Sequence, residues 1–295
     1  LPTAFGEKLV MRIFDPDVLQ KTFEQLGLAD DDLARWHRMT GQGNGIVLVT
    51  GPTGSGKTTT LYSTLRQLAT SEVNVCTIED PIEMVESAFN QMQVNHSISL
   101  DFSSGVRALM RQDPDIIMVG EIRDLETANM AVQAALTGHL VLSTLHTNDS
   151  PSSISRLLEL GVPAYLIRAT VRGVMSQRLV RILCAQCKTF GPLDLDAWRE
   201  LTQPWQMEPP AQIARPVGCK LCRDTGYMGR QGIYEVLVNS PLVQPHITPH
   251  LETAKIREVA MSEGMHTLRL SGATRVARGE TTIEEVMRVA PVLDA

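Results

Sequence analysis

A glycine-rich stretch, "GPTGSGKTTT" from residue 51 to 60, contains the residue types that bind nucleotide phosphates. The spacing Gly51-x-x-x-x-Gly56-Lys57-Thr58 fits the phosphate-loop pattern, between an apolar run and a helical pattern. Such glycines let backbone N–H groups turn toward the β-phosphate at a helix N-terminus. Lys57 should bridge the β- and γ-phosphates, and the Thr58 hydroxyl should hold Mg²⁺. The flanking pattern disfavours an accidental turn. The predicted ATP-binding residues are Gly51, Pro52, Thr53, Gly54, Ser55, Gly56, Lys57, Thr58 and Thr59.

Acidic residues follow two later apolar runs, "VNVCTIED" and "DIIMVGE". Hydrolysis of a γ-phosphate needs a metal, an oriented water and neutralised charge, so a carboxylate near the loop is expected. Glu121, at the end of the second run, could orient or deprotonate the water. A helix N-terminal acid is the competing interpretation, and it suits Asp124 better than Glu121. The other candidate acids are Glu79, Asp80 and Glu83.

Two histidines, His139 and His146, flank the run "HLVLSTLH", and Thr137 comes just before it. Their odd separation puts them on opposite faces of an unbroken strand, so only one is expected to face the phosphates. His146, at the carboxyl end of the run, is the better candidate. The other histidines are interpreted as structural: His37, His96, His246, His250 and His266.

Four of the five cysteines form two Cys-x-x-Cys pairs, Cys184 with Cys187 and Cys219 with Cys222. With two residues between them, both cysteines of a pair can bind the same tetrahedral metal ion. Four thiolates would fill its coordination sphere and leave no open position for catalysis. We therefore predict structural Zn²⁺, with free thiols or disulfides as the alternatives. Cys76 lies in an apolar run and is interpreted as a buried filler. Basic residues near the pairs form either a solvated face or a docking surface: Lys188, Lys220, Arg223 and Arg230.

The elements that must position these residues alternate along the chain. Alternating strands and helices predict an α/β fold with a parallel sheet, whose functional residues gather at the carboxyl ends of the strands. The helix at 282–290 opens with a capping box of Thr282 and Glu285. The expected strands are 45–50, 73–80, 115–121 and 139–146, and the expected helices are 57–68, 125–138, 251–263 and 282–290.

The chain divides into four expected regions. Residues 1–14 end a truncated N-terminal subdomain, because the chain starts in mid-pattern at a leucine. Residues 15–44 are a linker that ends in a glycine-rich hinge. Residues 45–183 form the nucleotide-binding core. Residues 184–295 form a small, mainly helical C-terminal domain, with the zinc element at 184–222.

The composition limits the function classes. A net charge of −6 and an aromatic content of 4% disfavour a nucleic-acid-binding surface. A nucleic-acid translocase with zinc knuckles stays open as the alternative function. No apolar run approaches the roughly 20 residues that span a bilayer, and the chain shows no signal peptide.

Four motifs together resemble a known family. "GPTGSGKTTTLY", "TIEDPIE", "RALMRQDPDIIMVGEIRD" and "TGHLVLSTLHTND" are similar to the Walker A, Asp box, Walker B and His box of the secretion ATPase superfamily. That family includes type II secretion ATPases and type IV pilus assembly and retraction ATPases. The paired cysteines, followed by "TGYMGRQGIYEVL", resemble the assembly branch.

The resemblance implies a RecA-like core in a cytoplasmic homo-hexameric motor, peripherally attached to the bacterial inner membrane. Such a motor would hydrolyse ATP to drive pilus or pseudopilus assembly through membrane platform proteins, and no nucleic-acid partner is expected. It further implies Glu121 as the general base, with Thr137 and His146 at the γ-phosphate. Arg12 would complete a site from the upstream domain. Lys8 stands where type II secretion members often have arginine, a departure from the pattern.

Overall fold

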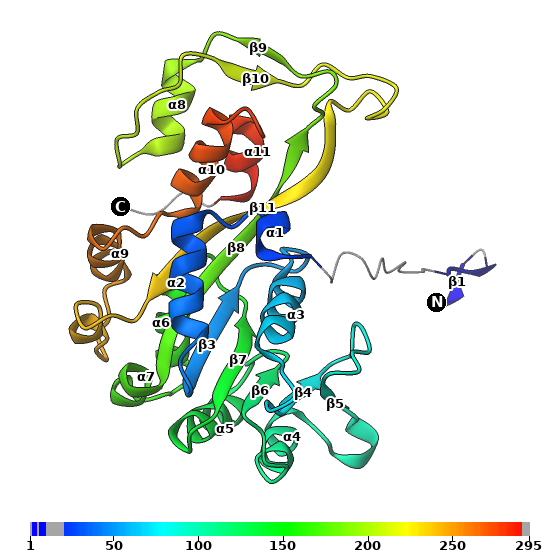
Figure 1. Ribbon diagram of the computed structural model, residues 1–295, viewed down its shortest axis with the longest axis vertical. Helices are drawn as coiled ribbons and strands as arrows, with labels where there is room; N and C mark the ends of the chain where they lie inside the picture. The colour runs from blue at the N-terminus through cyan, green and yellow to red at the C-terminus, as the bar shows by residue number, and fades with distance from the viewer. Residues whose placement is uncertain (1, 5, 10–20, 291–295) are drawn as a thin grey trace.

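The computed structural model describes residues 2–4, 6–9 and 21–290. Its centre is a seven-stranded sheet in the order β11-β8-β3-β7-β6-β4-β5 (Figure 1). All neighbours pair in parallel except β11, which runs antiparallel to β8. The predicted α/β class with a mostly parallel sheet is confirmed. The strands are β3 (Gly45–Thr50), β4 (Val75–Glu79), β5 (Asn90–Gln93), β6 (Ile116–Val119), β7 (Leu140–Leu145), β8 (Val171–Leu183) and β11 (Tyr227–Val238).

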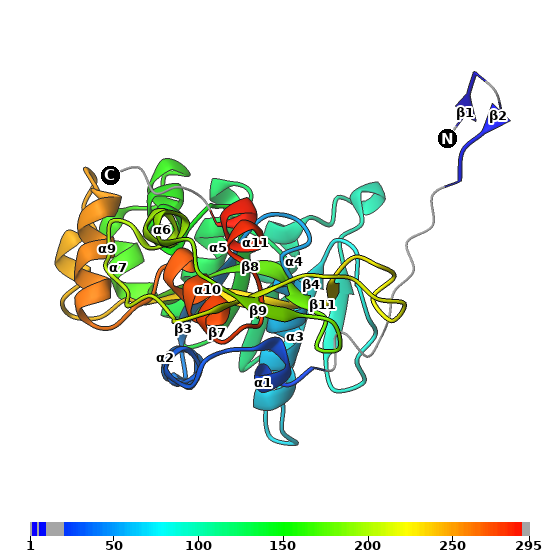
Figure 2. The same ribbon diagram turned by 90° about the horizontal axis from the view of Figure 1, so that it is seen from above.

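Helices cover both faces of the sheet, because side chains along each buried strand alternate between two apolar clusters. In β3, Ile46 and Leu48 pack with one cluster, and Val47 and Val49 pack with the other. Figure 2 shows the two helical layers on either side of the sheet. One layer is α1 (Phe23–Leu26), α2 (Asp30–Thr40) and α3 (Lys57–Leu68), and the other is α4 (Phe102–Leu109), α5 (Leu125–Leu136), α6 (Ser150–Glu159), α7 (Ala164–Thr170) and α9 (Thr253–Ser262).

A third apolar cluster lies at the far end of the long β8–β11 pair, at the top of Figure 1. There Trp198 and Leu201 pack with Leu268 and Val286, which come from the last part of the chain. The cluster joins α8 (Leu195–Thr202), α10 (Leu268–Ala277), α11 (Ile283–Val289) and β10 (Ile213–Arg215), which pairs with β9 (Thr189–Gly191). The remaining short elements are β1 (Pro2–Thr3), β2 (Gly6–Glu7), η2 (His96–Ile98) and η3 (Gln244–His246).

The helices of the described residues are short. The longest, α3 and α5, have 12 residues each. None has both the length and the apolar character that a membrane crossing requires.

The predicted linker at 15–44 needs correction, since its later part belongs to the core. Trp36 and Met39 of α2 are fully buried against the sheet. The Trp36 indole N–H also donates to Thr64 Oγ1 of α3 at 3.1 Å. From Phe23 onward this segment is therefore a packed layer of the fold.

The predicted boundary near residue 184 does not separate the sheet from the C-terminal region. Strand β11 comes after the cysteine pairs and forms an edge of the main sheet. Helix α9 packs against the same face as α6, through Ile256 and Ala260. The predicted mainly helical C-terminal domain at 184–295 therefore shares β11 with the main sheet, because the chain returns to it.

The predicted helix ends are mostly confirmed. Helix α5 ends at Leu136, and Gly138 follows with φ of +107°. Thr282 caps α11 by accepting the Glu285 N–H at 3.4 Å. The capping box is only half formed, because the Glu285 carboxylate instead accepts the Arg181 N–H and guanidinium.

Candidate nucleotide site and metal centre

The phosphate loop connects β3 to α3 and lies tightly against β8. A Cβ on Gly51 would lie 2.5 Å from the Gln177 carbonyl oxygen and 2.6 Å from Ser55 Oγ. Gly56 adopts a left-handed conformation, with φ of +88°, at the N-cap of α3. Only glycine meets both demands, so the sequence pattern has a direct steric reason.

The loop opens into a cavity of about 670 Å³ at the carboxyl edge of the sheet. This volume suits a nucleotide-sized ligand. The predicted residues Thr53, Gly54, Gly56, Lys57, Thr58 and Thr59 line it, together with the acidic candidates Glu79, Asp80, Glu83 and Glu121, and His146. The fold thus gathers three sequence motifs around the phosphate loop.

Lys57 folds back over the loop. Its Nζ donates to the Gly51 carbonyl at 2.8 Å and the Pro52 carbonyl at 3.1 Å. Burial lowers the pKa of Lys57, an effect that the Glu121 carboxylate opposes. Ser55 Oγ is buried and has no hydrogen-bond partner in the described part of the chain. A lysine, an orphaned hydroxyl and the N-terminus of α3 fit the phosphates of a nucleotide.

Glu121 lies two residues beyond β6, and its carboxylate lies between the side chains of Arg123 and His146. Its Oε1 accepts from Arg123 Nη2 at 2.5 Å, and its Oε2 lies 3.5 Å from His146 Nε2. Burial, followed by the nearby Lys57 charge, lowers the pKa of His146, so the neutral imidazole is favoured at neutral pH. A carboxylate beside a neutral imidazole can orient and deprotonate a water molecule.

Glu79 has a different environment, although it lines the same cavity. Its carboxylate accepts from Thr77 Oγ1 at 2.6 Å, Tyr62 Oη at 2.8 Å and Gln91 Nε2 at 3.2 Å. The side chain is 3% exposed. These bonds occupy the oxygen atoms that a general base would use, so Glu79 holds the wall of the cavity in place.

Thr137 lies at the other end of the sheet. It caps α5, and its Oγ1 donates to the Gln133 and Ala134 carbonyls at 3.0 Å. His139 is its neighbour, with Nδ1 3.1 Å from the Thr137 Oγ1. Both precede Leu140, which pairs with Gly45 at the start of β3, whereas the phosphate loop follows the end of β3. The prediction that Thr137 contacts the γ-phosphate bound by its own chain is therefore wrong. Arg12 lies outside the described residues.

Leu179 of β8 and Arg230 of β11 are among the cavity residues that the sequence analysis did not assign to the nucleotide site. Arg230 was grouped with basic residues of the zinc element, as a solvated face or a docking surface. The strand ladder is irregular between Tyr227 and Arg230, and Arg230 pairs with Arg181 beyond this irregularity. Only the antiparallel return of β11 brings Arg230 over the nucleotide site, and no local motif signals that return.

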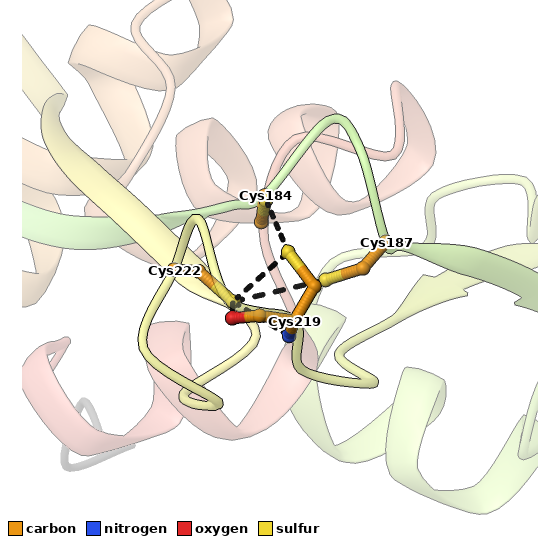
Figure 3. A group of neighbouring side chains, drawn as sticks. All are labelled: Cys184, Cys187, Cys219 and Cys222. Carbon is orange, nitrogen blue, oxygen red and sulfur yellow. Dashed lines mark hydrogen bonds between the residues drawn. The ribbon is translucent and has the colours of Figure 1, made fainter.

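The four paired cysteines converge between the ends of β8 and β11 (Figure 3). Their Sγ–Sγ distances are 3.9 Å for Cys184–Cys219, 3.8 Å for Cys187–Cys222 and 3.7 Å for Cys219–Cys222. Bonds of about 2.3 Å to a tetrahedral ion would place the sulfur atoms roughly 3.8 Å apart. All are free thiols, at distances far beyond a disulfide bond. The cluster therefore fits a four-coordinate metal ion.

Backbone donors also support a thiolate at this cluster. Cys222 Sγ accepts the Cys219 N–H at 3.2 Å and the Gly226 N–H at 3.3 Å. Although burial disfavours the thiolate, these donors lower the pKa of Cys222. Cys76, in contrast, is buried in β4, as predicted for an apolar filler.

Comparisons with known proteins agree with this geometry. The family model described as "Type II/IV secretion system protein" matches residues 1–288. The type IV pilus assembly ATPase TfpB of Acinetobacter baylyi is 60% identical over 99% of this chain and 50% of its own length. The type II secretion system protein HxcR of Pseudomonas aeruginosa is 45% identical over 98% of this chain and 58% of its own length. The chain thus spans about half the length of the curated relatives it matches.

A solved structure shares the fold. The pilus retraction motor PilT, crystallised with ADP, superposes with a TM-score of 0.68 at 29% sequence identity. The match covers 92% of this chain and 67% of that one.

Proposed function

The chain belongs to the type II/IV secretion system protein family, and on this premise we propose that it is the ATP-hydrolysing part of a pilus or pseudopilus assembly motor. The observation that carries the proposal is the single cavity lined by Lys57, Glu121 and His146. A phosphate-binding lysine, a base and a neutral imidazole are the groups that γ-phosphate hydrolysis needs in one place.

Each residue has a proposed role in that reaction. Lys57 and the backbone N–H groups of the phosphate loop neutralise charge on the β- and γ-phosphates. Thr58 would hold Mg²⁺, which adds positive charge at the same phosphates. Glu121 orients and deprotonates the attacking water, and His146 hydrogen-bonds near the γ-phosphate. Arg123, which pairs with Glu121, holds that carboxylate in place.

Of the two machines, we propose the pilus assembly motor. The relative at 60% identity is a pilus assembly ATPase, whereas the type II secretion relatives match at 41–45%, as do two other pilus assembly ATPases at 45%. We propose that the protein works on platform proteins of the inner membrane from the cytoplasmic side, as a homo-hexamer.

If the motor is a ring, activity per chain should rise with protein concentration. Beside Lys57 the cavity holds Arg230 and Arg123, and Arg123 already pairs with Glu121, so an arginine from another domain would supply further positive charge for a transferring phosphoryl group. Turnover per chain, measured on the full-length protein across the monomer-to-hexamer range, should therefore increase. We propose Arg12 as one such arginine, so Arg12→Ala should lower turnover more than nucleotide affinity. Constant specific activity across the range would exclude the ring motor, and ATP would then act as a switch.

We also propose that the cysteine cluster holds one structural Zn²⁺ per chain. The ion would join the ends of β8 and β11, and four thiolates would leave it no catalytic position. Replacing Cys184, Cys187, Cys219 or Cys222 by serine should abolish zinc binding and expose the loop 188–218 to protease. Cys76→Ser is the matched control and should keep the metal. Elemental analysis of freshly purified, unchelated protein provides the measurement, and a zinc-free wild type would contradict the assignment.

A further inference from the structure

The loop at 146–150 begins with His146 and joins β7 to α6. Its first half is fixed to two neighbouring strands. The Thr147 N–H donates to Thr50 Oγ1, at the end of β3, at 2.9 Å. The Asn148 carbonyl accepts from Arg178 Nη2, on β8, at 2.7 Å. One hydrogen bond each thus ties residues 147 and 148 to β3 and β8.

Its second half is fixed by residues from the C-terminal region. The Ser150 N–H donates to Glu235 Oε1, on β11, at 2.7 Å, and Ser150 Oγ donates to the Glu235 carbonyl at 2.8 Å. Asp149 caps α6 through the Ser152 N–H at 2.7 Å, and its Oδ2 accepts from Arg257 Nη2, on α9, at 3.0 Å. Two elements beyond the metal centre thus hold the loop that carries His146.

The ionisable side chains of this cluster are well buried, and burial raises the pKa of Glu235 to about 7. Glu235 is 1% exposed, Arg178 4%, Asp149 5% and Arg257 8%. Charges taken out of water cost desolvation, and apolar side chains of similar volume are often at least as stabilising. Within the described residues, Glu235 Oε2 and Arg257 Nε also have no hydrogen-bond partner. Stability alone therefore explains the cluster poorly, and its place beside the reaction centre suggests another use.

We propose that Arg257 and Glu235 are positioning residues, which hold the 146–150 loop so that His146 is aimed at the γ-phosphate. This inference rests on the proposed ATP hydrolysis. His146 precedes Asp149 by only three residues, and its imidazole lines the cavity beside Glu121. A shift of Asp149 or Ser150 would be passed to His146 through the short backbone between them. The position of α9 and β11 would thereby set the catalytic geometry.

The first test replaces Arg257 by glutamine in the full-length protein. We expect ATP turnover to fall by about 10- to 100-fold, since a displacement near 1 Å can cost that much. The dissociation constant of a fluorescent ATP analogue should change by less than about 3-fold, because the phosphate loop is untouched. The matched control is Arg269→Gln in α10, a similarly buried arginine that donates to the Glu200 carbonyl at 2.9 Å. Equal loss of turnover in both variants would overturn the proposal.

The second test asks whether Arg257 acts through His146. In a His146→Ala background, Arg257→Gln should lower turnover by less than about 2-fold, because the side chain to be aimed is gone. A full additional loss in that background would overturn the positioning role. If Arg257→Gln fails to fold, the double variant Asp149→Asn/Arg257→Gln removes both charges and keeps a good N-cap at residue 149. Turnover of wild-type level in that variant would equally refute the proposal.

Failure of the positioning role is distinguishable from failure of the proposed function. A wild-type protein that hydrolyses ATP while Arg257→Gln does so equally well refutes only the positioning role. A wild-type protein that hydrolyses no ATP at any concentration refutes both.

Discussion

Replacing Glu121 by glutamine should lower ATP turnover by about 10²- to 10⁴-fold while ATP still binds. Glutamine keeps the shape and the hydrogen-bonding capacity of the side chain but cannot take a proton from water. The structure strengthens this expectation, since the Glu121 side chain is 16% exposed and lines the cavity beside His146, where an attacking water can reach it. Steady-state hydrolysis and equilibrium binding of ATP, measured on the same full-length protein, separate chemistry from binding.

The matched control is Glu126→Gln, which neutralises an exposed acid in the first turn of α5. It should leave turnover within about 3-fold of the wild type. If the Glu121 variant stays within a few-fold of the wild type, the base lies elsewhere, and Glu83 becomes the next candidate. Glu79 comes after it, because three hydrogen bonds already engage its carboxylate.

Replacing Lys57 by alanine should instead remove both binding and turnover. A charged hydrogen bond to a phosphate contributes about 1.5–3 kcal/mol, so affinity should fall by roughly 10- to 100-fold. The same charge stabilises the transition state, and turnover should fall by a further factor of about 10²–10³. Measurement of nucleotide affinity and hydrolysis in the full-length variant checks both numbers.

Lys188→Ala provides the control for Lys57→Ala, because Lys188 donates to the Gly279 carbonyl, away from the cavity. Its hydrolysis should equal that of the wild type. Unchanged hydrolysis in the Lys57 variant would refute the assignment of the phosphate loop. The Glu121 and Lys57 variants together distinguish loss of chemistry from loss of binding.

Much of the site could be predicted because its signals are local. The phosphate loop is a continuous stretch, and its glycines are required by contacts that a Cβ would block. Glu121 and His146 lie within two residues of the ends of apolar strands, and parallel strands bring their carboxyl ends to one edge. The four cysteines were predicted from their spacing, and the fold brings them together at distances that suit an ion.

The rest depends on long-range packing that no local pattern reports. Thr137 was placed at the γ-phosphate by the family resemblance, but the length of β7 separates it from His146 across the sheet. Arg230 reaches the cavity only because β11 returns beside β8, more than forty residues after β8 ends. The partners of Asp149 and Ser150 come from residues about a hundred positions away. Trp36 was placed in a linker because its burial depends on α3 and the sheet.

The way the chain leaves and re-enters the sheet has a consequence for how such a protein could evolve. Residues 184–226 depart after Leu183 and return at Tyr227, and these two residues are paired neighbours in the ladder. In topological terms the segment is an insertion in a hairpin, so a single genetic event could add or delete it without reordering the strands. Its α8 nevertheless fills a core with α10 and α11 through Trp198 and Leu201. A lineage that lost the insertion would therefore have to acquire a polar surface on α10 and α11 at the same time.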